Sequence, residues 1–152
     1  MTDRLTPEQR KLNMSRIRAK NTKPEMIVRR ALHSLGFRFR LHRRDLPGTP
    51  DVVLPKWRTA IFVSGCFFHG HDCALFRLPA TNTEFWAQKI GRNRERDQKD
   101  VAALLNKGWR VVTVWECALK GKQKLSSDHL CDALHQFIGG QAKQGAVSGA
   151  GR

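Results

Sequence analysis

Residues 51–63 read Asp-Val-Val-Leu-Pro-Lys-Trp-Arg-Thr-Ala-Ile-Phe-Val, two apolar runs separated by a short polar turn. Such runs are typical of adjacent β-strands, and the break at Pro55 separates a strand at 51–54 from one at 59–63. Trp109 to Trp115 is another apolar, β-branched run, which predicts a strand that is largely buried. These three strands indicate the fold class.

The segments around these strands complete the predicted order. Alternating apolar and basic residues at 37–41 predict one more strand. Helices are predicted, from their caps and apolar spacing, at 6–19, from Thr22 to Gly36, at 83–105 with a break at Gly91, and at 127–138. The order predicts an α/β fold, a mixed β-sheet flanked by helices. Residues 139–152 hold five glycines and few large side chains, and are expected to be disordered.

Composition and charge narrow the classes of function. The 152 residues include 28 Lys and Arg against 13 Asp and Glu, a net charge of +15. Residues 1–44 hold 13 of the basic residues and 3 of the acidic ones, so the excess is concentrated in the first third. Clustered positive charge of this kind indicates a nucleic-acid partner.

The same sequence argues against a membrane or secreted protein. The longest uncharged apolar run, 59–68, is about half of the roughly 20 residues that a membrane span needs. No hydrophobic segment follows Met1, so we expect no secretory signal. Four cysteines without such a signal favour the reducing cytoplasm, where metal binding is more common than a disulfide.

Residues 65–73 read Gly-Cys-Phe-Phe-His-Gly-His-Asp-Cys and hold two cysteines and two histidines. Two thiolates and one imidazole nearly complete a tetrahedral zinc shell. Cys117, just after the strand at 109–115, is the natural fourth ligand. Cys131 competes, but its place on an apolar helix face favours a buried, inert side chain. His69 and His71 compete for one ligand position, and their spacing alone does not decide between them.

Three carboxylates could take part in chemistry, and each also has an ordinary structural explanation. Asp51 begins a strand, where it is either an Mg²⁺ ligand or a turn residue. Glu25 is the third residue after the helix cap Thr22 and fits a capping box. Asp97 lies in a run of alternating charge at 92–97 that is typical of a solvated helix face.

Four ordered motifs together resemble the very-short-patch repair (Vsr) DNA mismatch endonucleases. They are Leu-Pro-Gly-Thr-Pro-Asp (46–51), Ile-Phe-Val-Ser-Gly-Cys-Phe-Phe-His-Gly-His (61–71), Pro-Ala-Thr-Asn-Thr-Glu-Phe-Trp (79–86) and Val-Trp-Glu-Cys (114–117). The resemblance extends from about residue 10 to 121 and assigns residues 1–138 to a single endonuclease domain. It implies a restriction-endonuclease-like fold and an enzyme that nicks double-stranded DNA at a T:G mismatch left by deamination of 5-methylcytosine.

The resemblance also implies roles for the candidate residues. A structural Zn²⁺ would be held by Cys66, His71, Cys73 and Cys117. His69 would be the catalytic base, and Asp97 would orient it. Asp51 and the backbone carbonyl of Val63 would hold a catalytic Mg²⁺, with Glu25 near its waters. Restriction-like nucleases often carry Glu-x-Lys on the second of these strands; here that strand ends Phe-Val-Ser, so an imidazole has to replace the missing base.

The DNA contacts follow in the same way. By resemblance, Phe67 and Phe68 enter the base stack from one groove and Met14 enters from the other, which costs least at a weakly stacked mispair. Lys89 and Asn93 match positions that contact the mispaired bases. Two departures bear on rate and on base preference. Ser64 stands where relatives often have His or Asp, and Phe68 stands where Trp is usual.

A second interpretation remains beside this one. A zinc-stabilised DNA-binding module without catalysis would share the positive charge, the zinc cluster and the wedge residues, but it would not need Asp51 and His69 in one pocket. In the enzyme interpretation the partner is double-stranded DNA, and mismatch-repair proteins are candidate partners. The protein is expected to act as a monomer in the cytoplasm, associated with the nucleoid.

Overall fold

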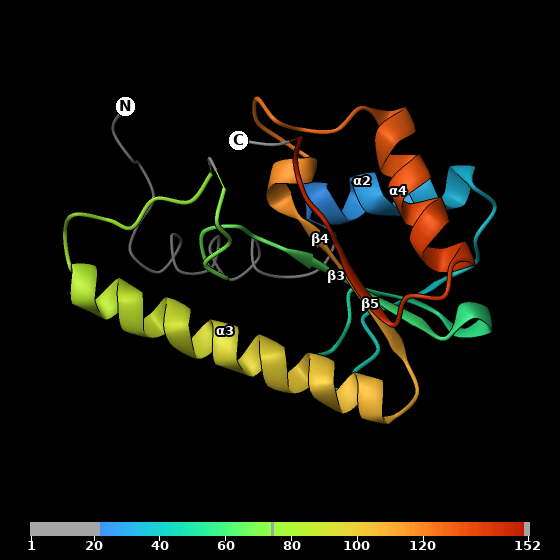
Figure 1. Ribbon diagram of the computed structural model, residues 1–152, viewed down its shortest axis with the longest axis horizontal. Helices are drawn as coiled ribbons and strands as arrows, with labels where there is room; N and C mark the ends of the chain where they lie inside the picture. The colour runs from blue at the N-terminus through green and yellow to red at the C-terminus, as the bar shows by residue number, and fades with distance from the viewer. Residues whose placement is uncertain (1–21, 74, 151–152) are drawn as a thin grey trace, which may run out of the picture.

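The computed structural model describes residues 22–73 and 75–150, which form a five-stranded sheet with helices on both faces (Figure 1). Its elements are α2 (Lys23–Ser34), β1 (Arg40–Leu41), β2 (Val52–Leu54), η1 (Pro55–Trp57), β3 (Thr59–Ser64), α3 (Thr83–Asn106), β4 (Arg110–Trp115), η2 (Glu116–Ala118), α4 (Ser127–Gly139) and β5 (Gln144–Val147). The predicted helix at 6–19, with Met14, lies outside the described residues.

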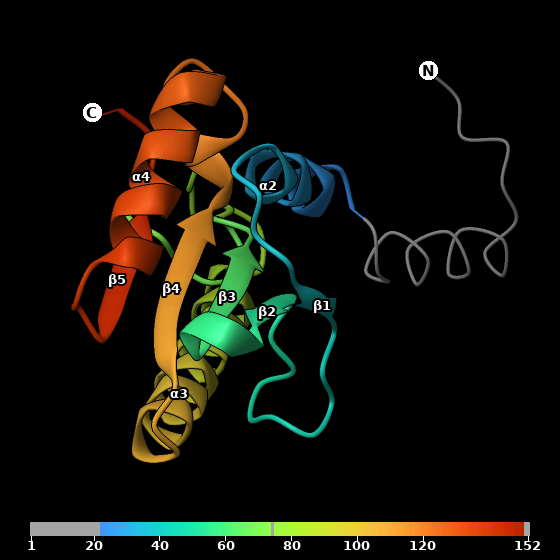
Figure 2. The same cartoon turned by 90° about the vertical axis from the view of Figure 1, so that its right-hand side faces the viewer.

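The sheet is mixed, as the sequence predicts. The strands lie in the order β1-β2-β3-β4-β5, and Figure 2 shows them side by side. β1 pairs antiparallel with β2, and β2 pairs antiparallel with β3, to which the short turn η1 connects it. β3, β4 and β5 are parallel, and α3 lies in the connection from β3 to β4. Both strands that the sequence places beside the candidate site, β3 and β4, are therefore neighbours.

Helices cover both faces of the sheet because strand side chains alternate between the faces. Val52 and Ile61 pack with residues of α2 and α4 in one core. Val53 and Ala60 pack with Leu104 of α3 in a second core. In Figure 1, α3 runs along one side of the sheet and extends past the strands, while α2 and α4 lie on the other side. No helix among the described residues has the length and apolar character for crossing a bilayer.

Two elements differ from the sequence-based prediction. The helix α3 continues through Gly91, where a break was expected, because a single glycine costs a helix only about 1 kcal/mol. The strand expected at 37–41 is reduced to Arg40 and Leu41. Phe37 packs edge-on against Trp57 instead, with ring centroids 5.7 Å apart.

The expectation of a disordered segment at 139–152 is wrong over most of its length. Residues 144–147 form β5, and Val147 pairs with Val114 of β4. Val147 is 6% exposed and belongs to the core beneath α2 and α4. The glycine-rich composition hid this strand because its stability comes from pairing and one buried side chain, not from local propensity.

Replacing Val147 by Ala tests whether β5 is part of the fold. Removing two buried methyl groups should lower the free energy of unfolding by about 2 kcal/mol, measured by urea denaturation. Gln144→Ala, at an exposed position of the same strand, is the matched control and should change it little. Equal stability of the Val147→Ala variant and the wild type would mean that the strand does not contribute.

Candidate active site and metal centre

Cys66, His71, Cys73 and Cys117 come together in the fold. One ligand atom from each lies within 4.8 Å of the others. The first three belong to the loop after β3, and Cys117 lies in η2 directly after β4. His71 Nδ1 is 3.5 Å from Cys66 Sγ and 3.6 Å from Cys117 Sγ. A tetrahedral zinc ion with ordinary bond lengths separates its sulfur and nitrogen ligands by roughly 3.6 Å, so this donor set fits Zn²⁺.

The electrostatics of the cluster also favour a cation. Cys66 is fully buried, and burial raises the pKa of its thiol. A divalent cation supplies the positive charge that makes buried thiolates stable, as in other thiolate metal sites. Cys131 lies apart from the cluster, with its sulfur 3.7 Å from the hydroxyl of Ser34. It packs against the core on α4 but is only partly buried, where the sequence favoured a buried side chain.

A tight turn inside the loop separates the two histidines. His69 N–H donates to the carbonyl of Gly65, and His71 N–H donates to that of Cys66 at 2.9 Å. Gly70 lies between them at φ +62°, where a Cβ atom would come within 2.7 Å of Ile90. Only glycine fits there without strain. The turn places His71 in the cysteine cluster and directs His69 toward α3.

Trp115 connects the two histidine environments. Its ring stacks on the His71 imidazole at 4.1 Å and 10°. The same ring meets His69 edge-on, with centroids 6.4 Å apart. The side chain at the end of β4 therefore supports His71 of the cysteine cluster on one side and His69 on the other. Nothing in the sequence pattern predicts this role for the tryptophan.

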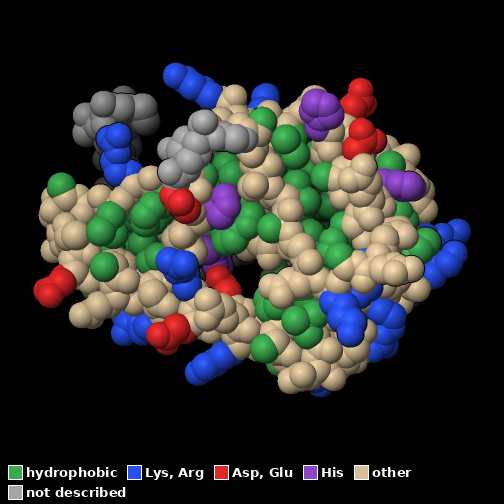
Figure 3. Space-filling view, viewed as in Figure 1, with side chains coloured by type: hydrophobic (Ala, Val, Ile, Leu, Met, Phe, Trp, Pro, Cys, Tyr) green, Lys and Arg blue, Asp and Glu red, His purple; other side chains and the backbone are tan. Residues whose placement is uncertain are grey.

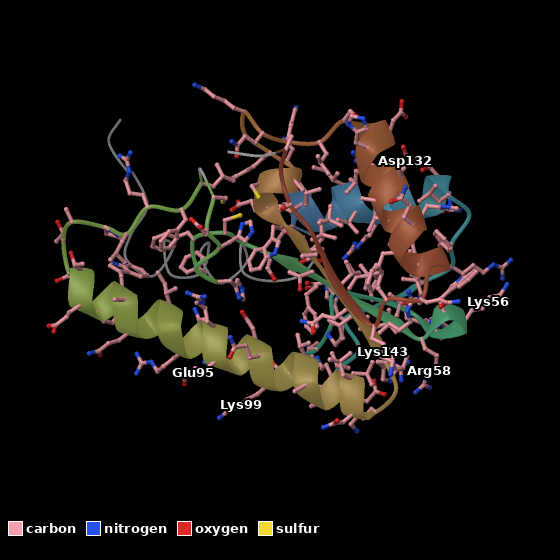
Figure 4. All side chains as sticks on the ribbon, viewed as in Figure 1. Lys56, Arg58, Glu95, Lys99, Asp132 and Lys143 are labelled. Atoms are coloured by element: carbon pink, nitrogen blue, oxygen red, sulfur yellow. The ribbon has the colours of Figure 1, made fainter. Side chains whose placement is uncertain are left out.

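His69 pairs with Asp97. Its Nδ1 lies 2.5 Å from Asp97 Oδ2, across the space between the loop after β3 and α3. An ionised carboxylate can only accept, so Nδ1 donates the hydrogen bond and Nε2 carries the lone pair. Glu95 and Lys99, two residues away on either side of Asp97, extend from α3 away from the sheet (Figure 4). The charged run at 92–97 is thus partly a solvated face, but Asp97 faces the site.

Asp51 lines the same cavity as His69 and Asp97. Its Oδ2 accepts a hydrogen bond of 2.7 Å from Val63 N–H, which ties the start of β2 to the end of β3. Burial and the nearby Glu25 charge raise the pKa of Asp51 to about 6, although the Val63 bond and His69 act in the opposite direction. A cation bound beside this carboxylate would offset both the cost of burying its negative charge and the repulsion from Glu25.

Among the described residues, Glu25 pairs with two basic side chains that the sequence did not predict. Its N–H meets the Thr22 hydroxyl at 3.4 Å, as the capping box predicts. Its carboxylate oxygen Oε2 accepts from Arg29 at 3.0 Å and from His42 Nε2 at 2.9 Å. His42 has φ 48°, and its N–H donates to the Asp51 carbonyl. Glu25, His42 and Asp51 form a second group of potential metal ligands. No spacing rule in the sequence links His42 to the other two.

Two adjoining cavities collect the candidate residues. Asp51, Val63, Ser64, His69 and Asp97 line a cavity of about 250 Å³. A second cavity of about 660 Å³ shares Asp51 and His69, and is also lined by Glu25, Phe68, Lys89 and Asn93. Figure 3 shows a hollow beside α3 with histidine and acidic side chains at its edge. The two groups required by the enzyme interpretation, Asp51 and His69, thus share one pocket.

An aromatic cluster borders the larger cavity. The rings of Phe67 and Phe68 are 5.0 Å apart, and Phe67 packs against Trp86 of α3 at 5.3 Å. Phe68 remains 41% exposed. Lys89 lies over the Trp86 ring at 5.5 Å, and Asn93 donates to the Phe68 carbonyl at 2.9 Å. Exposed aromatic surface next to a cation is a suitable surface for stacking nucleobases.

Basic side chains are also present far from this cavity. Lys56, Arg58 and Lys143 lie together at the end of the sheet near η1 (Figure 4). Arg58 stacks over the Trp109 ring at 4.7 Å. Positive charge is therefore also present at this end of the sheet, and basic side chains do not by themselves mark the candidate site.

Comparison with known proteins adds independent information. Residues 2–75 match the family described as DNA mismatch endonuclease Vsr. The type II nicking enzyme V.XorIIP of Xanthomonas oryzae pv. oryzae is 56% identical over 119 residues, 78% of this chain and 88% of that protein. The DNA mismatch endonuclease Vsr of Escherichia coli is 43% identical over 142 residues, 93% of this chain and 91% of that protein. The type II nicking enzyme V.NmeAIP of Neisseria meningitidis is 45% identical over 122 residues, 80% of this chain and 87% of that protein.

The raised pKa of Asp51 predicts a pH-dependent cost to stability. The folded pKa of about 6 lies above the ordinary value of 3.8, so the folded state binds the proton more tightly. Stability is therefore lost as pH rises from about 4 to about 6. Between pH 4.5 and 7.5, the wild type should lose about 2 kcal/mol of unfolding free energy relative to Asp51→Asn, which keeps an acceptor for Val63. Urea denaturation without added divalent cation measures this difference.

Adding Mg²⁺ provides the control. At pH 7.5 it should stabilise the wild type and leave Asp51→Asn unchanged, because a cation bound only to the folded carboxylate stabilises by mass action. A constant stability difference across the pH range would contradict the raised pKa.

Proposed function

The chain belongs to the Vsr family of DNA mismatch endonucleases, and we propose that it nicks one strand of double-stranded DNA at a T:G mismatch left by deamination of 5-methylcytosine. The observation that carries the proposal is the shared cavity of Asp51 and His69, with Asp97 behind the imidazole. A cation ligand and a positioned base are two groups that together can support metal-assisted phosphodiester hydrolysis.

Asp51 and the carbonyl of Val63 would hold Mg²⁺, which prefers oxygen ligands. The Val63 N–H donates to Asp51. Because the N–H and C=O of one strand residue face the same side of the strand, the Val63 carbonyl also faces Asp51, which supports a cation held by both. When bound, Mg²⁺ polarises the scissile phosphate and stabilises charge on the leaving oxygen. Glu25, in the adjoining cavity, would hold water near the cation.

His69 would act as the general base. Asp97 holds Nδ1 and so leaves Nε2 to accept a proton from the attacking water. Water adds to phosphorus as its proton passes to Nε2, the bond from phosphorus to the leaving oxygen breaks, and that oxygen takes a proton from solvent, so that one strand is cut. The end of β3 reads Phe62-Val63-Ser64 and offers no acid or lysine for this task, which supports the assignment to the imidazole. We also infer a restriction-endonuclease-like fold from the mixed sheet and its cavity.

Mismatch recognition would use the aromatic cluster. Phe67 and Phe68 would enter the stack at the mispair, and Met14 would enter from the opposite groove. A T:G pair stacks less well than matched pairs, so opening that step costs less there. Lys89 and Asn93, in the same cavity wall as Phe68, would contact the mispaired bases. The smaller ring of Phe68 and the hydroxyl of Ser64, in place of the usual groups, should alter flanking-base preference and rate.

The alternative, a zinc-stabilised DNA-binding module without catalysis, shares the charge, the cysteine cluster and the aromatic surface. It gives no reason for a histidine, its carboxylate partner and a buried aspartate to line one cavity. We therefore favour the enzyme. A nick in one strand has no need of a two-fold partner, so we propose a monomer that acts on chromosomal DNA in the cytoplasm, where mismatch-repair proteins are candidate partners.

A heteroduplex panel tests the activity. With Mg²⁺, the protein should nick one strand of a duplex with a T:G pair and leave the T:A duplex intact. Asp51→Asn should lower the nicking rate by at least about 100-fold, because the cation loses its charged ligand. Asp132→Asn, on α4 away from the cavity (Figure 4), is the matched control and should match the wild type. Equal cutting of T:A and T:G duplexes would contradict the proposal.

A double-mutant cycle tests the pairing of His69 with Asp97. His69→Ala should lower the single-turnover nicking rate by about 100- to 10,000-fold, the range for loss of a general base. Asp97→Asn should lower it less, and should have no further effect once His69 is gone, because Asp97 acts through the imidazole. Multiplicative effects of the two substitutions would show that Asp97 acts on the reaction independently.

A further inference from the structure

The C-terminal segment reaches the cysteine cluster. β5 runs parallel to β4, and the last paired residues are Val147 and Val114. Cys117 follows Val114 by one short turn, and Gly149 follows Val147 by two residues. Because β4 and β5 are parallel, the segments that follow them leave the sheet at the same end. The segment that composition alone marked as disordered therefore passes directly beside a proposed metal ligand.

A hydrogen bond connects these two segments at that end of the sheet. Gly149 N–H donates to Cys117 Sγ at 3.2 Å. A second backbone donor comes from within the cluster, where Cys117 N–H meets Cys66 Sγ at 3.3 Å. Three thiolates and one neutral imidazole around a Zn²⁺ ion leave a net charge of about −1. N–H groups directed at the sulfurs offset this excess and hold the ligands in place.

The backbone of Gly149 packs so closely against its neighbours that no side chain can be accommodated at this position. A Cβ atom on Gly149 would lie 2.6 Å from the Cys117 carbonyl oxygen and 2.7 Å from that of Gln123. The next residue continues the contact, since Ala150 N–H donates to the Gln123 carbonyl at 2.8 Å. Any side chain at 149 would thus push the backbone away from Cys117 and break the N–H to sulfur bond.

We infer that the segment 144–150 closes the zinc site, with Gly149 as a positioning residue that stabilises the Cys117 thiolate through its backbone N–H. The inference rests on the proposed zinc site and extends it to a part of the chain far from residues 66–73 in sequence. Through Cys117 and His71, the C-terminal segment then supports the loop that carries His69.

Two substitutions at one position test this directly. Gly149→Ala displaces the backbone, and Gly149→Pro removes the N–H group itself. Both full-length variants should bind zinc about 10- to 100-fold more weakly than the wild type, the usual effect of losing an outer-shell hydrogen bond, and should therefore release it faster to a chromophoric chelator. Ser148→Ala, at the exposed neighbouring position, is the control and should release zinc at the wild-type rate.

Replacing zinc by cobalt distinguishes loss of the hydrogen bond to sulfur from a general loss of stability around the metal site. In the Co²⁺ form, the sulfur-to-metal charge-transfer band of both Gly149 variants should move to lower energy, because the thiolate loses a donor, whereas Ser148→Ala should leave it in place. Unchanged release and an unchanged band would overturn the inference while leaving the nicking proposal intact. Wild-type protein purified without zinc would overturn the metal site itself, and the heteroduplex assay would then test the activity separately.

Discussion

The convergence of three sulfurs and one imidazole is the constraint on which the rest of the site depends. It ties the loop after β3 to the turn after β4, two segments that the sheet already places side by side. Between two ligands of this cluster lies His69, turned out of it by Gly70 and held by Asp97. In the proposed function, a structural metal and a catalytic base would thus share one short loop, and the end of the loop in the cysteine cluster would fix the position of the base.

Much of the fold could be predicted from apolar periodicity, because the buried strands β2, β3 and β4 and the amphipathic α2 and α4 have strong local patterns. β5 could not, since residues 144–147 have little propensity of their own and gain stability only from pairing with β4. The shortened β1 has a similar cause. Phe37 packs on Trp57, outside the sheet, and this long-range contact has no local signal in the sequence.

For the site, residue chemistry and spacing identified the cysteine cluster, but spacing alone could not choose between His69 and His71. The turn at Gly70 makes that choice in three dimensions. Neither His42 nor Gly149 carries a signal in the sequence. His42 reaches Glu25 through a backbone conformation with positive φ, and Gly149, which has no side chain, contacts Cys117 through its backbone N–H.

X-ray absorption at the zinc edge, on the wild type and on His69→Ala, tests most directly whether the loop divides its two histidines in this way. We expect three sulfur neighbours at about 2.3 Å and one nitrogen at about 2.0 Å in both proteins, with no change on substitution. Loss of the nitrogen neighbour in His69→Ala would show that the imidazole assigned to catalysis is a metal ligand, and would contradict the division of roles on which the proposed mechanism depends.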